Sequence, residues 1–214
     1  MTVLRRFTLH ALAVTLVGTS LSACAPLLIG GAAVGTLVAV DRRTSGTQLE
    51  DETIELRAAS RLREALGDRA HINVTSYNRQ VLLTGEVPDA AAKQTAEQVV
   101  SRVENVRSTV NEVDVMLPSS LTQRATDTYI TGRVKAALID DKQLSVSAFK
   151  VVTERGTVFL MGRVTQREAD RVAAVVRNVN VNGLKRVVRV FEIISEEDLA
   201  RIAPKSAAPA SAAR

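Results

Sequence analysis

The chain has few of the side chains that catalytic and metal sites need. Its 214 residues include one cysteine, two histidines and no tryptophan, and aromatic residues make up 3% of the total. One cysteine excludes a disulfide within the chain, and two histidines are too few for a multi-histidine metal site. No pair of acids stands in a catalytic constellation. We therefore expect no enzyme activity, no metal and no cofactor.

The single cysteine lies near the N-terminus, behind a leader-like segment. Two arginines precede an apolar run (residues 7–21) that is too short and wrongly flanked for a spanning helix. The letters LSAC then resemble the lipobox of bacterial lipoproteins. This resemblance implies that residues 1–23 are a signal peptide, that Cys24 is acylated on sulfur and nitrogen, and that Ala25 directs the protein to the outer membrane. The alternative is an ordinary signal peptide with an incidental cysteine.

The remainder contains an internal repeat. VLLTGEV (81–87) recurs as VFLMGRV (158–164), 77 residues later. The flanking segments repeat at shifts of 72 and 78 residues: 61–66 with 133–138, and 106–115 with 184–193. The change from 72 to 77 predicts a five-residue insertion before the glycine-containing strand of the second copy. Two copies indicate tandem domains rather than a solenoid.

The residue pattern of each copy predicts the same order of elements: helix, hairpin, helix, strand. The first helix has an apolar face in both copies: Leu56, Ala59, Leu62 and Leu66 in one, and Ile130, Val134, Ala137 and Leu138 in two. The hairpins turn at residues 78–79 and 155–156. Asp89 begins the second helix of copy one, and Thr165 with Glu168 forms a capping box in copy two. The predicted class is α+β, with two helices on one face of a three-stranded mixed sheet.

These patterns resemble a known family. An αββαβ unit whose second strand reads V-x-L-x-G-x-V is similar to the BON domain, and two such units behind a lipobox resemble the dual-BON outer-membrane lipoproteins of Gram-negative bacteria. The resemblance covers most of residues 33–194. The expected organisation is a signal peptide, a lipidated tether, a first BON domain, a linker, a second BON domain and a disordered tail: 1–23, 24–50, 51–117, 118–126, 127–194 and 195–214.

Gly85 and Gly162 occupy the same position in the two copies and allow two interpretations. A strand glycine can admit a ligand, or it can mark a bend or a close approach of another backbone. We favour the second interpretation, because both copies keep the glycine although its neighbours differ.

The two copies differ in charge. Residues 51–117 hold 8 basic and 11 acidic side chains, whereas residues 121–194 hold 13 basic and 7 acidic side chains. A basic surface on a lipid-anchored envelope protein favours contact with anionic headgroups such as those of phosphatidylglycerol or cardiolipin. A solvated basic face that binds nothing is the alternative.

An exposed tyrosine favours the membrane interpretation. The spacing of Ile130, Val134 and Leu138 turns Tyr129 away from the core, and an aromatic ring beside Arg133 suits a membrane interface. The family resemblance implies a lipid-contacting aromatic residue at position 129, with Ile139 as a companion. Charge adds four further candidates for lipid contact: Arg133, Lys135, Lys185 and Arg186. Alternatively, Tyr129 lies at the contact between the two domains.

The expected protein is thus anchored through Cys24 to the periplasmic face of the outer membrane and binds anionic phospholipid through copy two. The resemblance implies a role in outer-membrane integrity at division sites. A module that binds an envelope protein and regulates envelope assembly or cell-wall remodelling is the alternative. Nothing in the sequence indicates nucleic-acid binding.

Overall fold

The computed structural model describes residues 41–202, which belong to one compact unit. Cys24, the predicted signal peptide and the end of the predicted tail lie outside these residues. Copy one consists of the following elements: α2 (Ser45–Leu66), η2 (Gly67–Arg69), β1 (His71–Tyr77), β2 (Gln80–Val87), α3 (Ala90–Ser101), β3 (Ser108–Asn111) and β4 (Asp114–Val115). Copy two consists of α4 (Leu121–Asp140), η3 (Val146–Ala148), β5 (Phe149–Glu154), β6 (Thr157–Val164), α5 (Gln166–Arg177) and β7 (Arg186–Ile193), and α6 (Glu196–Ile202) follows it.

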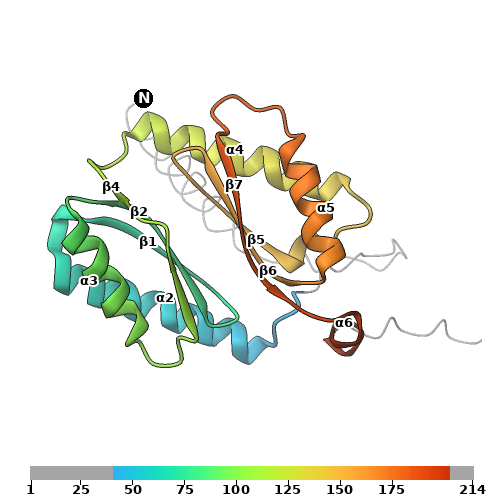
Figure 1. Ribbon diagram of the computed structural model, residues 1–214, viewed down its shortest axis with the longest axis horizontal. Helices are drawn as coiled ribbons and strands as arrows, with labels where there is room; N and C mark the ends of the chain where they lie inside the picture. Colours follow the sequence, from blue (N-terminus) through green and yellow to red (C-terminus); the bar gives the residue numbers. More distant parts are fainter. Residues whose placement is uncertain (1–40, 203–214) are drawn as a thin grey trace, which may run out of the picture. The chain divides into compact units, whose positions relative to one another are not determined.

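The predicted α+β architecture is confirmed in both copies (Figure 1). The middle strand, β2 or β6, pairs antiparallel with the strand before it and parallel with the strand after the second helix. In copy one the last strand is broken into β3 and β4, and both pieces pair with β2. The Asn111 side chain accepts the backbone N–H of Val113 at the break, where the buried Val113 leaves the regular ladder.

The hairpin turns and helix caps lie at the residues that the sequence predicts. Both hairpins turn where predicted, and Asn78, Arg79 and Arg155 adopt the positive φ angles that two-residue hairpin loops need. Asp89 caps α3 through the backbone N–H of Ala92. The capping box of α5 is present as well.

The apolar face predicted for α2 is wrong in part: Leu62 and Leu66 contact the core as predicted, but Leu56 does not. Ile54, Ala58 and Leu62 are buried, whereas Leu56 is 74% exposed. The buried positions of α2 match those of α4, namely Ile130, Val134 and Leu138, at a shift of 76 residues rather than 72. The difference of four residues is close to one helical turn. Aligning the two helices one turn out of register therefore keeps the same spacing of apolar residues and conceals the error. The segment between the first helix and the glycine-containing strand is therefore one residue longer in copy two than in copy one, and not five residues longer as predicted.

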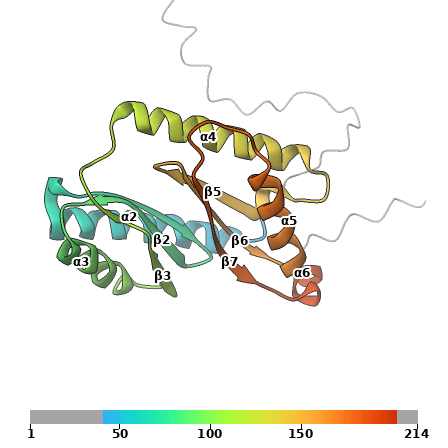
Figure 2. The same ribbon diagram turned by 45° about the horizontal axis from the view of Figure 1, so that its top comes forward.

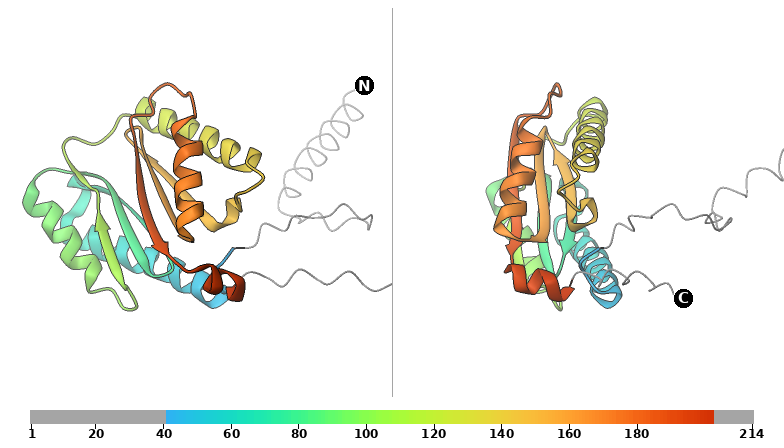
Figure 3. Two further views of the ribbon diagram at one scale, coloured as in Figure 1. Left: turned by 45° about the vertical axis from the view of Figure 1, so that its right-hand side comes forward. Right: turned by 90° about the vertical axis from the view of Figure 1, so that its right-hand side faces the viewer.

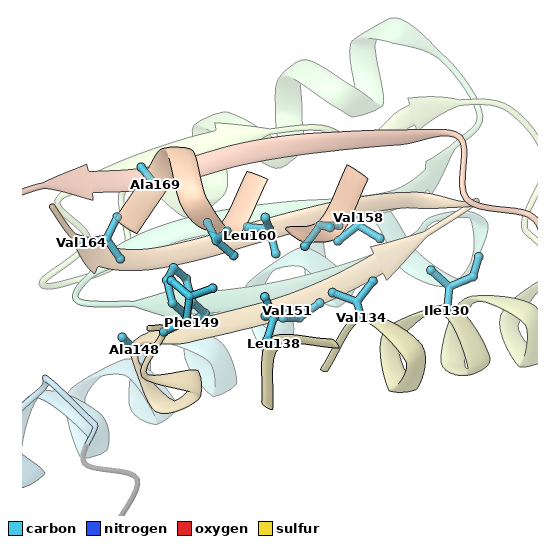
Figure 4. Close-up of a cluster of buried hydrophobic side chains, with 13 residues drawn as sticks. Ile130, Val134, Leu138, Ala148, Phe149, Val151, Val158, Leu160, Val164 and Ala169 are labelled. Carbon is cyan, nitrogen blue, oxygen red and sulfur yellow. The ribbon is translucent and has the colours of Figure 1, made fainter. Parts of the chain in front are cut away.

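The structure has helices outside and sheets inside (Figures 2 and 3). Val81 and Leu83 of β2 point to a core under α2 and α3. A corresponding core lies under α4 and α5 (Figure 4). The opposite faces of the two sheets share a third cluster, formed by Tyr77, Leu82, Phe159, Met161 and Val190. The two copies thus pack sheet against sheet, and their helices face outward.

The backbone-contact interpretation of the two glycines fits the structure. A Cβ built on Gly85 would lie 2.1 Å from the carbonyl oxygen of His71, and one on Gly162 would lie 2.4 Å from that of Ala148. Both positions therefore require a bare backbone.

Two elements extend past the predicted domain boundaries. Helix α2 begins at Ser45, inside the segment predicted as a tether, and α4 begins at Leu121, inside the predicted linker. Helix α6 occupies the first part of the predicted tail. No helix within residues 41–202 has the length and apolar character needed to cross a membrane.

Candidate functional site

Helix α4 carries the main candidate residues, and its register decides which of them face outward. Ser120 caps the helix by accepting the backbone N–H of Gln123. Ile130, Val134 and Leu138 then fall on the buried face, as their spacing predicts. The opposite face of α4 lies on the outside of copy two (Figure 3).

That outer face is apolar over most of its length. Tyr129 is 59% exposed, Ile139 is 65% exposed and Leu121 is 83% exposed. Ala125 and Ala136 lie between them and are also exposed. From Leu121 to Ile139 the helix rises about 27 Å. Solvent-exposed apolar side chains on one helix face form a surface that can enter a lipid interface.

Two cations flank this apolar face. Arg133 and Lys135 are exposed, and neither side chain forms an ion pair within residues 41–202. Lys142, just after the helix, is also exposed and has no ion pair within these residues. In contrast, Arg171 and Arg189 of copy two are paired with aspartates. Arg133, Lys135 and Lys142 thus lie along α4 and just after it, where they are available to an anionic ligand. Arg177 of α5 is exposed as well, but its Nε donates to the carbonyl oxygen of Ala173.

The structure separates the other two charge-based candidates. The loop before β7 contacts the N-terminal half of α4 through Gly183, whose added Cβ would lie 3.0 Å from a Thr126 methyl group. Lys185 follows in this loop, is exposed, and has no ion pair within the described part of the chain. Arg186 instead pairs with Glu112 of copy one at 3.3 Å. Arg186 is therefore turned toward copy one and not toward the free cations.

Sequence reasoning missed Leu117 and Leu121, which are 85% and 83% exposed. Leu117 ends the predicted first domain and Leu121, the first residue of α4, falls in the predicted linker, so neither is among the predicted surface residues. Ser120 was the available signal, because a serine N-cap starts the helix at Leu121. The spacing from Leu121 to Ala125 and Tyr129 then places all three on one face.

Tyr129 is 59% exposed and, within residues 41–202, does not belong to the cluster that the two sheets share, so the alternative that it lies at the contact between the copies is wrong. Tyr77 fills this position instead, and its hydroxyl donates to the carbonyl oxygen of Ala148 at 3.3 Å. Burial raises the pKa of Tyr77 to about 12.

The contact between the copies also contains a fully buried carboxylate, Glu86. Arg155 Nε donates to its Oε1 at 2.6 Å, and His71 Nδ1 lies 2.9 Å from its Oε2. Burial alone would raise the pKa of Glu86, but the hydrogen bonds from His71 and Arg155 lower it below its ordinary value. Nearby Glu154 has a raised pKa because it is buried, and it accepts a hydrogen bond from Asn73.

The residues of the predicted tether that come just before α2 bind both copies. Arg42 Nη1 donates to Glu168 at 2.8 Å and to the carbonyl oxygen of Arg163 in copy two. Arg43 pairs with Asp51 of copy one at 2.7 Å, and its guanidinium carbon lies 4.4 Å from the ring centroid of Tyr77. The end of the tether is therefore fixed where the two copies meet.

No group of three or more His, Cys, Asp or Glu side chains in the described part of the chain is arranged to hold a metal ion. The cavities there are shallow grooves beside sheet edges and between the copies. One of about 450 Å³ lies beside β1 and is lined by both apolar and acidic residues.

Comparison with known proteins assigns the family. The BON domain model matches residues 50–116 and 126–195. The chain belongs to the BON domain family. It is 36% identical over 176 residues to "Outer membrane lipoprotein DolP" of Haemophilus influenzae, which covers 81% of this chain and 90% of that protein. The two matched segments coincide with copies one and two, hereafter BON domains one and two.

Two further similarities were found. The "21 kDa hemolysin" of Actinobacillus pleuropneumoniae is 35% identical over 72% of this chain and 80% of its own length. A solved structure of CdsD, a structural protein of the type III secretion system of Chlamydia trachomatis, is 13% identical with a TM-score of 0.30, covering 75% of this chain and 99% of its own. The family and the H. influenzae relative show that this chain is an outer-membrane lipoprotein with two BON domains.

Proposed function

We propose that the protein binds anionic phospholipid through the outer face of α4 in BON domain two. The observation that carries this proposal is the pairing of an exposed apolar stripe with unpaired cations on one helix. Tyr129 and Ile139 would enter the headgroup region, while Arg133 and Lys135 meet lipid phosphates. Lys185 is a further candidate contact. Arg186 is a weaker one, because it already pairs with Glu112.

The expected binding is electrostatic with shallow apolar insertion. Each lysine or arginine near an anionic surface contributes on the order of 1 kcal/mol, and this contribution fades within a Debye length. Binding should therefore be strong for vesicles of phosphatidylglycerol or cardiolipin, weak for neutral vesicles, and lost at high salt.

The anchor would be Cys24, acylated at the mature N-terminus. The lipobox supports this proposal, and the printed name of the H. influenzae relative describes a lipoprotein. Mass spectrometry of the N-terminal peptide tests it directly, since Cys24→Ala should abolish both the acyl mass and membrane retention. By resemblance to the family, we further propose a role in outer-membrane integrity at division sites, where a fluorescent fusion of the protein should gather.

Vesicle flotation tests the lipid proposal with the chain from residue 25 onward, which contains the whole compact unit. Tyr129→Glu should weaken capture by phosphatidylglycerol vesicles about tenfold or more, because the inserting ring is lost and the new carboxylate is repelled by the anionic headgroups. Leu56→Glu is the matched control, since Leu56 is also an exposed large apolar side chain, 74% against 59% for Tyr129, but lies on α2 of BON domain one. Equal capture of neutral and anionic vesicles, or equal loss in both variants, would contradict the proposal.

A further inference from the structure

The outer edge of strand β1 in BON domain one is open. Within the described residues, β1 pairs only with β2 and ends the sheet order. The pair next to the hairpin turn is Tyr77 and Gln80. Every second residue of β1, counted back from Tyr77, therefore exchanges backbone hydrogen bonds with β2. The backbone groups of Ile72, Val74 and Ser76 therefore point away from the sheet.

One end of this edge is already occupied by side chains. Ser76 N–H donates to Glu55 Oε1 at 2.7 Å, and Lys150 Nζ donates to the carbonyl oxygen of Ser76 at 3.3 Å. A carboxylate and an ammonium group thus take the places that a neighbouring strand would fill. Ile72 and Val74 lie next along the edge, and no such substitute is found for them within residues 41–202.

A groove of about 450 Å³ runs beside these two residues. Its apolar lining comes from both walls: Leu56 and Ala59 of α2, with Ile72 and Val74 of β1. Leu56 is 74% exposed, although it is a large apolar side chain. An open strand edge beside an apolar groove is the arrangement by which domains bind an extended peptide as an added strand.

The charge of the groove selects the occupant. Glu52 and Glu55 line it. Glu55 pairs with Lys150 at 2.8 Å, whereas Glu52 has no ion-pair partner in the part of the chain that the structure describes, so Glu52 carries the free negative charge. BON domain one carries more acidic than basic residues, 11 against 8 over residues 51–117. An acidic rim repels anionic headgroups, so this surface does not suit the membrane that α4 would bind.

We propose that the groove between α2 and β1 binds an extended, basic polypeptide segment of another protein by strand addition. The backbone of the segment would pair with Ile72 and Val74, an apolar side chain would cover Leu56, and a lysine or arginine would meet Glu52. BON domain one would thus be the protein-binding half of the molecule. This inference is independent of the lipid-binding proposal.

The test uses the chain from residue 25 onward and a short synthetic peptide of alternating lysine and valine. Amide hydrogen exchange, followed by NMR, should slow about tenfold or more at Ile72 and Val74 when the peptide is added. The same peptide N-methylated at alternate residues, and a version with glutamate in place of lysine, should give no such slowing. Equal protection by either control peptide would overturn the proposal.

Variants separate this groove from the rest of the surface. Leu56→Glu and Glu52→Lys should each weaken binding of the lysine–valine peptide about tenfold. Glu64→Lys, an exposed position on the same helix, and Tyr129→Glu should leave binding unchanged. Unchanged binding in Leu56→Glu overturns the proposal. So does protection of Ile72 and Val74 that grows with protein concentration without peptide, because the occupant would then be a second copy of the chain.

Discussion

Asp51 and Asp127 occupy the same position in the two domains, and each carboxylate binds the hairpin turn of its own domain. Asp51 accepts the backbone N–H groups of residues 78 and 79, at 2.8 and 2.7 Å. Asp127 accepts those of residues 155 and 156, at 2.9 and 2.8 Å. Both aspartates are buried. The first helix of each domain is thereby fixed to the hairpin, which sets the register of α4 and the outward direction of Tyr129.

Removing this contact should destabilise BON domain two. Asp127→Ala leaves two turn N–H groups without their acceptor, and we expect the free energy of unfolding to fall by about 2 kcal/mol or more. Urea denaturation measures this loss. Asp140→Ala is the control, because Asp140 is exposed on the same helix and should change stability little.

The contact between the domains should depend on Arg155. Within residues 41–202, Arg155→Ala leaves the buried Glu86 carboxylate with His71 as its only side-chain partner. Removing one partner of such a pair costs about 3 kcal/mol. A double-mutant cycle with Glu86→Gln should show strong coupling between the two positions, and purely additive losses would contradict the assigned ion pair.

Stability should also depend on pH through Glu86. Its pKa lies below the ordinary value of 4.5, so its stabilising effect is complete above pH 4.5 and is lost as the pH falls through the lowered pKa. Near neutral pH, Glu86→Gln should therefore be less stable than the original protein. The difference should shrink below pH 4.5, as measured by urea unfolding at several pH values, and a constant difference would disagree with the lowered pKa.

Two glycine substitutions should have opposite effects. Gly85 has a φ angle of 110°, and an added Cβ would meet the His71 carbonyl oxygen, so Gly85→Ala should destabilise BON domain one by about 2 kcal/mol or more. Gly132 lies within α4 with open space around it, so Gly132→Ala should stabilise α4 by about 1 kcal/mol. Thermal unfolding distinguishes the two outcomes.

Much of the fold can be predicted because local signals agree with one another. The caps of α3 and α5, the two hairpin turns and the buried face of α4 all follow from residue type and spacing. The face of α2 could not be chosen in this way, because Ile54, Ala58 and Leu62 compete with a second apolar set that includes Leu56. The buried face of α2 also includes Asp51, and a charged residue on that face argues against burial when only the sequence is considered.

The packing of the two sheets was not predicted, although a signal was present. The strands VLLTGEV and VFLMGRV have nearly continuous apolar runs, and such runs indicate burial on both faces. Leu82 and Met161 therefore need a second partner surface, which each domain provides for the other. The extent of the α4 surface was missed for a different reason, because the domain boundary was placed after Leu121.

The outer face of α4 can be tested directly because the chain has only one cysteine, Cys24, which is absent from the chain that begins at residue 25. A single cysteine introduced as Ala136→Cys can carry an environment-sensitive dye beside an intact Tyr129. Ser60→Cys places the same dye at the equivalent exposed position of α2. We predict that phosphatidylglycerol vesicles shift the emission at position 136 to the blue and leave position 60 unchanged. No shift at position 136, or the same shift at both positions, would contradict membrane binding through α4.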